Sequence, residues 1–457
     1  MRAFLLLKNM KIFFVSLGCD KNLVDSEKML GLLSDEGYVI TDDEKEAEII
    51  VVNSCCFIGD AKQESIDTIL SMAKLKEEGK LKLLVVTGCL AQRYEKEILE
   101  ELPEIDVVIG INSIEKIVAA IKEALQEKQP IKKIDEPVLP ARSNKERLLT
   151  TGGHYAYLKI ADGCDKFCTY CVIPYVRGHY RSVPIEQLVE EARILVSKGV
   201  KELILVAQET TLYGVDLYGQ KKLPELLKSL CEIEDLKWVR LLYCYPEEIT
   251  DELIAVMKEE PKIVNYLDMP VQHASDEILK RMGRKTNRET IEALVKKLRK
   301  EIPDICLRTT LINGFPTEKR RHHKELKEFV SNMQFDRLGS FTYSPEENTP
   351  AVKMKGQVPQ FIKNKRKKEI MLLQQEIAFN RAKKYANDNN VIEVMIEGEL
   401  VEEGVFVGRS YKDAPGVDGL VFIHGARNLM SGDFIKVRIT DAKEYDLIGE
   451  YVDEFAE

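Results

Sequence analysis

Continuous runs of aliphatic residues, separated by helical stretches, constrain the fold of this chain more than any other feature. From residue 11 to about 125, the runs KIFFVS, EIIVVN, KLLVV and DVVIG alternate with stretches such as DSEKMLGLLSDEG. Strands without polar alternation are buried on both faces, as in a parallel sheet that helices cover on both sides. We therefore predict a doubly wound parallel α/β domain over residues 10–126.

The same alternation returns between residues 154 and 345. It follows residues 127–153, whose three prolines, many charges and closing Gly-Gly pair predict a linker. Six strand-like runs then follow: AYLKIA, ELILVAQ, WVRLLYCYP, YLDMPVQ, CLRTTLING and DRLGSFTYSP. Six βα units without a Gly-rich dinucleotide fingerprint favour a partial (β/α)6 barrel, with its functional loops at the carboxyl ends of the strands.

The C-terminal part predicts a long helix and a small barrel. Residues 359–387 repeat apolar side chains at three- and four-residue intervals, which indicates a helix that docks on the barrel, so that the barrel unit spans 154–387. Residues 388–457 hold short alternating strands, such as VIEVMIEGE and DFIKVRI, between Gly and Pro turns. This pattern predicts a small antiparallel β-barrel.

The composition predicts a cytoplasmic protein that does not enter a membrane. The chain of 457 residues is 44% hydrophobic and 31% charged, and no apolar run approaches the roughly 18 residues that cross a bilayer. The first residues do not predict a signal peptide, because Lys8, Asn9 and Lys11 interrupt the apolar run. We expect a monomer. The cytoplasm keeps thiols reduced, so metal or catalytic roles explain its ten cysteines better than a disulfide framework does.

Three of these cysteines form the strongest local signal. The stretch DGCDKFCTYC places Cys164, Cys168 and Cys171 at C-x3-C-x2-C spacing in a short loop after the first predicted barrel strand. Three thiolates this close can reach one metal centre, but they are one ligand short of a closed zinc or cluster site. His179, eight residues further on, is a poor fourth zinc ligand, so the spacing favours an iron–sulfur cluster with an open iron.

A second set of cysteines follows the predicted strands of the first domain. FFVSLGC ends at Cys19, IVVNSC at Cys55 and VVTGC at Cys89. Each lies just beyond the carboxyl end of a parallel strand, the edge where open α/β sheets gather their ligands. Buried cysteine is common in protein cores. Three cysteines at one topological position nevertheless favour a second cluster, again with an open iron.

The remaining cysteines of interest are predicted to pack in the core. Cys56 follows Cys55 directly and points to the other side of the chain if the strand geometry persists for one more residue. Cys231, Cys244 and Cys306 fall within helical or strand patterns of the second unit. We therefore exclude these four from the candidate metal ligands.

The arrangement resembles the radical S-adenosylmethionine (SAM) methylthiotransferases. The C-x3-C-x2-C spacing is similar to the radical SAM signature, and the two flanking units resemble the family's N-terminal three-cysteine domain and its C-terminal TRAM barrel. SLGCDKNLVDSE, YVRGHYRS, YLDMPVQHASDEILKRMGR and GRSYKDAPGVDGLVFI are similar to the branch that methylthiolates an aspartate of ribosomal protein S twelve. They are less similar to the sister branch that modifies adenosine 37 of transfer RNA.

The resemblance implies two [4Fe-4S] clusters and SAM as cofactors. The cluster on the C-x3-C-x2-C loop would cleave SAM to a 5'-deoxyadenosyl radical, which takes hydrogen from the β-carbon of the aspartate. The cluster on Cys19, Cys55 and Cys89 would present a sulfur that a second SAM methylates. An electron donor such as flavodoxin or ferredoxin is implied. A C–H bond without an acidic proton cannot be opened by a general base at neutral pH, which is a physical reason for radical chemistry.

A few other residues carry alternative interpretations. Tyr170 resembles the aromatic residue that lies against the adenine in this superfamily, or it packs within its loop. Glu209, after the second barrel strand, binds an amino group or caps the next helix. We predict that Gln272 and His273 form a hydrogen-bonded pair in a loop. The segment 313–324, NGFPTEKRRHHK, lacks the usual acidic pair and departs from the family after the GFP turn.

Charge distribution favours a protein substrate over RNA. Residues 386–457 hold 16 acidic and 6 basic residues, which accounts for the whole negative excess of a chain whose net charge is −9. This surface repels phosphates and attracts a ribosomal protein rich in Lys and Arg, free or within the small subunit. Modification of transfer RNA is the alternative. The basic runs EKRRHHK and KNKRKK predict solvated helix faces that leave contact with ribosomal RNA open.

Overall fold

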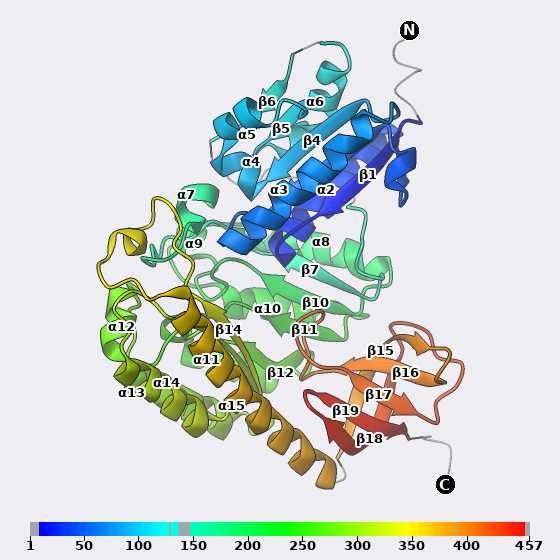
Figure 1. The fold of residues 1–457 in the computed structure, drawn as a ribbon. Coiled ribbons are helices and arrows are strands. Elements are labelled where there is room, and N and C mark those ends of the chain that lie inside the picture. Colours follow the sequence, from blue (N-terminus) through cyan, green and yellow to red (C-terminus); the bar gives the residue numbers. More distant parts are fainter. Residues whose placement is uncertain (1–8, 128, 137–146, 389, 453–457) are drawn as a thin grey trace.

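Two open parallel sheets and one closed barrel make up the protein. The computed structural model describes residues 9–127, 129–136, 147–388 and 390–452. Figure 1 shows the first sheet packed against the carboxyl-edge loops of the second, while the barrel lies beside the opposite end of the second sheet. No helix within these ranges is long and apolar enough to span a bilayer.

The N-terminal sheet is parallel throughout and has the strand order β2-β1-β3-β4-β5-β6. Its strands are β1 Lys11–Ser16, β2 Val39–Thr41, β3 Ile49–Ser54, β4 Leu83–Gly88, β5 Val107–Ile109 and β6 Ile131–Lys133. Its helices are α2 Asp20–Glu36, α3 Gly59–Ala73, α4 Cys89–Arg93, α5 Glu95–Glu101 and α6 Ile117–Ala124. Ile50 and Val52 face one apolar core, whereas Ile49 and Val51 face another. The doubly wound arrangement is therefore confirmed.

One strand of this sheet lies inside the segment that was predicted as a linker. β6 pairs with β5 in parallel, with Ile131 opposite Val107. A three-residue edge strand flanked by prolines and charges carries no periodic signal, so the sequence pattern could not reveal it. Residues 137–146 of the same segment lie outside the described residues.

The central sheet is also parallel, in the order β14-β13-β12-β11-β10-β7. Its strands are β7 Tyr155–Lys159, β10 Glu202–Val206, β11 Trp238–Leu241, β12 Ile263–Asp268, β13 Cys306–Asn313 and β14 Arg337–Thr342. The helices are α7 Ile173–Arg177, α8 Ile185–Ser197, α9 Val215–Tyr218, α10 Leu223–Cys231, α11 Asp251–Glu259, α12 Asp276–Arg281, α13 Arg288–Glu301, α14 Arg320–Met333 and α15 Gln360–Asn387. A small β8 Ala161–Asp162 and β9 Arg181–Ser182 pair lies beside it. The order follows the chain without closing, as predicted for a partial barrel.

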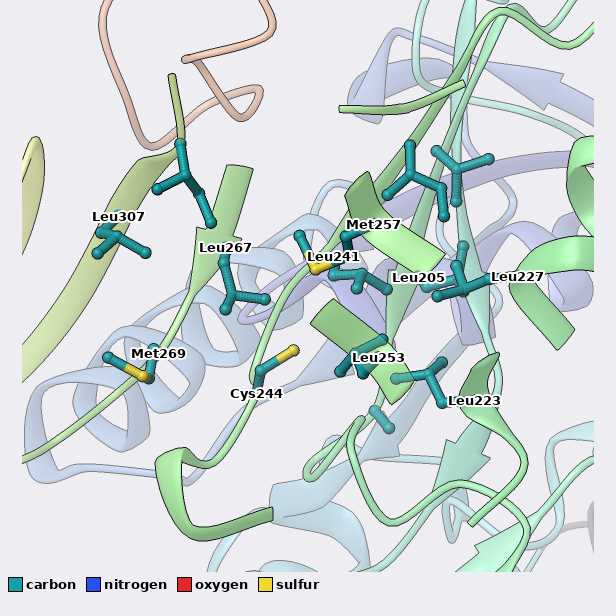
Figure 2. Packing of buried hydrophobic residues seen from close by; sticks show 14 of the residues in the cluster. Leu205, Leu223, Leu227, Leu241, Cys244, Leu253, Met257, Leu267, Met269 and Leu307 are labelled. Carbon is teal, nitrogen blue, oxygen red and sulfur yellow. The ribbon is translucent and has the colours of Figure 1, made fainter. Parts of the chain in front are cut away.

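Buried leucines hold the central sheet to its helices. Figure 2 shows Leu241, Leu253, Met257 and Leu267 in one apolar cluster, together with Cys244. The thiol of Cys244 is fully buried, and Cys231 and Cys306 are also buried in apolar clusters. The prediction that these three cysteines pack in the core is confirmed.

Truncation of one of these leucines tests the core. Leu241→Ala is expected to lower the free energy of unfolding by about 2–5 kcal/mol, because the fully buried side chain leaves a cavity that its neighbours cannot fill. Leu372→Ala on α15 is the matched control, since that side chain is 55% exposed and its loss should cost less than about 0.5 kcal/mol. Equal losses in denaturant titrations would contradict this account of the core.

The C-terminal unit is a closed barrel in the order β15-β16-β17-β19-β18. Its strands are β15 Val391–Leu400, β16 Val405–Ser410, β17 Val421–His424, β18 Phe434–Lys443 and β19 Asp446–Tyr451. Neighbouring strands are antiparallel except β17 and β19, which pair in parallel because β18 intervenes in the chain and forms a hairpin with β19. The predicted antiparallel barrel therefore contains one parallel pair.

This barrel docks on the face of the central sheet that the helices leave uncovered. Met395 packs in one apolar cluster with Trp238 and Tyr266. Beside it, the fully buried Glu202 carboxylate accepts from Arg240 Nε at 2.6 Å and lies 2.8 Å from Arg409 Nη2 of the barrel. A buried charge that loses its partner is strongly destabilising, so this ion group fixes where the barrel sits.

Candidate functional site

Three cysteines lie together at the carboxyl edge of the N-terminal sheet. β1, β3 and β4 are neighbours in the sheet, and Ser54 at the end of β3 lies opposite Gly88 at the end of β4. Cys19 is the N-cap of α2, Cys55 follows β3 directly, and Cys89 opens α4. The predicted convergence of these three residues at one edge is what the structure shows.

The turns that carry these cysteines touch one another. Gly18 has φ 90°, and a Cβ atom there would lie 2.7 Å from Cys55 Cβ, so only glycine fits. Asn22 Nδ2 donates to Leu17 O and to Ser54 O, each at 3.1 Å, while its Oδ1 lies 3.7 Å from Cys89 Sγ. One amide thus ties the ends of β1 and β3 to the Cys89 thiol.

The three thiols differ in exposure. Cys19 is exposed, whereas Cys55 and Cys89 are buried and burial raises the pKa of both thiols. Cys56 is buried among apolar residues, as expected for a packing residue, and burial raises the pKa of its thiol to about 12. Thiols with raised pKa values stay protonated at neutral pH, and a metal that binds them must displace those protons.

The second set of cysteines lies in the loop between β8 and α7. Cys164 and Cys168 are buried and Cys171 is half-buried. Cys171 N donates to Cys168 O at 3.0 Å and Cys164 N donates to Gly178 O at 3.1 Å, which folds the loop onto itself. Burial raises the pKa of the Cys164 thiol to about 12. The loop lies at the carboxyl end of β7, where the sequence predicts it.

Aromatic and cationic side chains surround this loop. The pKa of Tyr170 is raised, first by burial and then by the neighbouring Cys168, and its ring packs against the apolar cluster of Phe315. The Arg284 guanidinium lies 4.1 Å from the ring centroid of Tyr245, which provides a cation–π contact. Tyr170 therefore lies next to Cys168 and packs against residues from outside its own loop.

Glu209 is buried just beyond β10 with half of its carboxylate unpaired. Its Oε1 accepts from Thr211 N at 2.9 Å and from the Thr211 hydroxyl, whereas its Oε2 has no hydrogen-bond partner. Burial raises the pKa of Glu209 to about 7. Glu209 therefore binds the turn at Thr211 and does not cap the next helix, α9, whose N-cap Gly214 has no side-chain cap. Its free Oε2 is a ready acceptor for an amino group.

A pH dependence follows from this carboxyl. Because its folded pKa is about 7 against an ordinary 4.5, Glu209 contributes stability that is present below pH 4.5 and lost as the pH rises through 7. We expect Glu209→Gln, which cannot ionise, to be more stable than the parent protein by about 3 kcal/mol above that range. Denaturant titrations of apo protein below pH 4.5 and above pH 7 measure the difference in unfolding free energy between the variant and the parent. The same difference at both pH values would contradict the raised pKa of Glu209.

Gln272 and His273 form the expected hydrogen-bonded loop after β12. His273 Nδ1 accepts from Ala274 N and Ser275 N at 2.9 Å each, and burial lowers the pKa of His273 to about 3. Gln272 has φ 69° and pairs with Leu311 of β13 as an isolated bridge. The backbone of this loop is ordered by the strand beside it, so both residues have structural contacts.

The unusual segment 313–324 keeps its local structure. Glu318 Oε2 accepts from Gly314 N and from Phe315 N at 3.2 Å, and Glu318 Oε1 pairs with Arg366 Nη1 at 2.9 Å. His322 accepts from Lys319 N at 3.1 Å and caps α14. The Glu318 carboxylate and the His322 cap of α14 therefore hold the GFP turn in place, although a run of basic residues follows it.

Several polar residues between the two cysteine sets were not predicted from the sequence. Lys21 Nζ lies 3.0 Å from the ring centroid of Tyr243, whose hydroxyl donates to Asp20 at 3.2 Å. Tyr243 has φ 60°, an uncommon backbone conformation for a bulky residue. Arg177, the last residue of α7, donates to Cys89 Sγ. These contacts join residues more than 80 positions apart in the chain, so no local sequence pattern predicts them.

The donor sets fit iron–sulfur clusters better than single ions. In residues 9–127, 129–136, 147–388 and 390–452, no three His, Cys, Asp or Glu side chains surround a single metal ion. In a [4Fe-4S] cluster each thiolate binds a different iron, so the sulfurs spread further apart than around zinc. Two sets of three neighbouring cysteines have the composition that a cluster with one open iron requires.

Family models match three parts of the chain. The radical SAM superfamily model matches residues 158–330, the TRAM domain model matches 390–452, and the model described as uncharacterized protein family UPF0004 matches 11–110. The three ranges fall in the central unit, the C-terminal barrel and the N-terminal unit, although β14 and β6 lie outside the first and third of them. The TRAM assignment of the C-terminal barrel is confirmed.

Curated relatives align over almost the full length. A ribosomal protein uS12 methylthiotransferase RimO from Lachnoclostridium phytofermentans is 60% identical over 442 residues, which covers 96% of this chain and 99% of that protein. Proteins of the same name from Acetivibrio thermocellus and a Thermoanaerobacter species are 49% and 48% identical over 97% of this chain, and cover 99% and 100% of their own lengths.

A solved structure shares the fold over most of the chain. The radical S-adenosylmethionine methyltransferase TsrM from Kitasatospora setae, with cobalamin and a [4Fe-4S] cluster bound, has a TM-score of 0.54 at 15% identity. The match covers 75% of this chain and 77% of that chain. An identity this low shows a common fold alone.

A parallel sheet of six βα units with a C-x3-C-x2-C loop at its carboxyl edge, flanked by a three-cysteine sheet and a TRAM barrel, defines a radical SAM methylthiotransferase. Enzymes of the radical SAM superfamily work with an iron–sulfur cluster and SAM. Within this class, the chain belongs to the RimO family of ribosomal protein uS12 methylthiotransferases.

Proposed function

We propose that this protein methylthiolates the β-carbon of an aspartate in ribosomal protein uS12. The observation that carries the proposal is 60% identity over 96% of the chain to a protein of that name. The acidic excess of residues 386–457 supports it, because a basic ribosomal protein is the complementary partner. Both cysteine sets lie where the N-terminal and central sheets meet, which supports one shared reaction site.

Six cysteines would hold two [4Fe-4S] clusters in this proposal. Cys164, Cys168 and Cys171 would hold the cluster that, with SAM, supplies a 5'-deoxyadenosyl radical. Cysteines at the strand ends of the N-terminal sheet would bind the auxiliary cluster, which would carry the methylthio sulfur. These are Cys19, Cys55 and Cys89. The chemistry of thiolate donors and the one missing ligand in each set support this assignment.

Two residues near the C-x3-C-x2-C loop would bind SAM. The unpaired Glu209 Oε2 is buried, and Lys166 of the loop is an electrostatic neighbour of this carboxyl, so Glu209 would accept from the amino group of SAM. Tyr170 lies beside Cys168, within reach of an adenine on the same cluster. Both residues would bind and orient the cofactor.

The domains divide these tasks. We assign the auxiliary cluster to residues 10–126, radical generation to 154–387 and substrate docking to the TRAM barrel at 388–457, with 127–153 as the connection. The protein would act as a cytoplasmic monomer on uS12, free or within the small subunit, and would take electrons from flavodoxin or ferredoxin. Its cluster thiols support a reducing compartment.

A competition assay tests the substrate. Reconstituted protein with dithionite and SAM would receive a peptide from the target loop of uS12 and a transfer RNA that contains isopentenyladenosine. Modification of the peptide alone is expected. Modification of the RNA alone would replace the proposal with a MiaB-type transfer RNA methylthiotransferase, and absence of 5'-deoxyadenosine would overturn radical catalysis altogether.

A further inference from the structure

A single buried arginine connects the two cysteine sets. Arg177 ends α7, the short helix that begins two residues after Cys171, and its side chain is 1% exposed. Arg177 Nη1 donates to both oxygens of Asp162 at 3.0 Å. Asp162 stands two residues before Cys164, so this bidentate pair closes the base of the C-x3-C-x2-C loop.

The other nitrogen of the same guanidinium reaches into the N-terminal domain. Arg177 Nη2 donates to Asn22 Oδ1 at 2.6 Å and to Cys89 Sγ at 3.6 Å. Asn22 is the residue whose amide also holds the turns before Cys19 and Cys55. Arg177 is therefore directly bonded to the C-x3-C-x2-C loop on one side and to the other cysteine set on the opposite side.

The surroundings fix this guanidinium in place. Asp25 Oδ2 lies 3.4 Å from both Nη atoms, and Lys159 Nζ pairs with Asp25 and with Asp162, at 3.2 Å for the latter. Two cations thus face two anions in a buried, neutral group. The neighbouring residue Val176 of α7 packs in the apolar core of the N-terminal domain. This contact holds α7, and with it the Arg177 side chain, in place.

We propose that Arg177 is a positioning residue that sets the distance between the two clusters and donates a hydrogen bond to the Cys89 thiolate of the auxiliary cluster. This inference rests on the proposed function, because it needs a cluster at Cys89. Hydrogen bonds to cluster sulfurs stabilise the more negative, reduced state and raise the reduction potential. Lysine is a poor replacement, since Arg177 contacts Asp162 through Nη1 and Cys89 through Nη2, and lysine lacks this planar fork of two separate nitrogens.

The test uses full-length protein in two cysteine backgrounds. With the C-x3-C-x2-C cysteines changed to alanine, the reconstituted chain keeps only the auxiliary cluster, whose midpoint potential is measured by EPR-monitored titration. Arg177→Lys, which keeps the buried group neutral, is expected to lower this potential by about 59 mV, a tenfold change in the one-electron equilibrium. With Cys19, Cys55 and Cys89 changed instead, the potential of the remaining cluster should not move.

A control arginine distinguishes a direct effect on the reduction potential of the auxiliary cluster from a general effect of contact between the domains. Arg93 also joins the two domains from a buried position, through Glu346 at 3.0 Å, but it contacts no proposed cluster ligand. Arg93→Lys should leave the auxiliary potential unchanged. If Arg177→Lys does not fold, Arg177→Gln with Asp25→Asn removes one charge of each sign and should lower the potential in the same direction.

The outcomes distinguish the inference from the proposed function. An unshifted auxiliary potential in Arg177→Lys, or an equal shift in Arg93→Lys, would overturn the role of Arg177 while the proposed function stands. A parent protein that binds one cluster only, with no iron lost on changing Cys89, would overturn the second cluster and the role of Arg177 together.

Discussion

Replacing Cys168 with alanine is expected to abolish 5'-deoxyadenosine formation and to lower the iron content from about eight to about four atoms per chain. Cys168 is the middle cysteine of the C-x3-C-x2-C loop and is 4% exposed, so no solvent thiol can easily take its place. A cluster held by only two thiolates is lost on desalting. Iron analysis and chromatography of the SAM reaction mixture measure the two effects.

Cys231→Ala is the matched control for this experiment. Cys231 is buried in the apolar cluster of the central sheet, so its loss costs packing but no ligand. We expect the control to keep about eight irons per chain and its full rate of SAM cleavage. Undiminished 5'-deoxyadenosine from Cys168→Ala would contradict the assignment of the radical cluster.

Replacing Cys55 with alanine is expected to separate the two halves of the reaction. The variant should still cleave SAM, because the C-x3-C-x2-C loop is intact, but it should form no methylthiolated peptide. Its iron content should fall to about four per chain, as the auxiliary cluster loses one of three thiolates. A Cβ atom added at Gly18 would lie 2.7 Å from Cys55 Cβ, so the turn at Gly18 packs closely against the Cys55 side chain where the strand ends meet.

The neighbouring cysteine supplies the control at almost the same place. Cys56 packs in the apolar core with Leu90 and Ala91, and Arg93 Nη1 donates to its carbonyl oxygen at 3.4 Å. Cys56→Ala should retain both clusters and product formation. If Cys56→Ala loses the second cluster and Cys55→Ala keeps it, the assignment within the pair is wrong.

The strand-end cysteines could be predicted because parallel strands determine where their carboxyl ends lie. Cys19, Cys55 and Cys89 each follow an apolar run, and in an open parallel sheet the ends of neighbouring runs share one edge. The C-x3-C-x2-C loop is a local signal and needs no tertiary information. Buried strands and their periodic helices likewise predict both sheets.

Contacts between distant segments could not be predicted in this way. Arg177 donates to Asn22 across 155 positions of the chain, and arginine is ordinarily an exposed residue. The short β6 strand and the parallel β17–β19 pair depend on which neighbour closes a sheet, and not on local periodicity. Tertiary packing decides these features, so a single sequence carries no pattern for them.

Tandem mass spectrometry of a uS12 peptide, treated with the reconstituted protein and methyl-deuterated SAM, decides whether the protein methylthiolates this substrate. We expect a labelled methylthio group on the β-carbon of the target aspartate, and none when Cys55 is replaced by alanine. An unmodified aspartate in the presence of 5'-deoxyadenosine formation, with the label found on adenosine of transfer RNA, would contradict it.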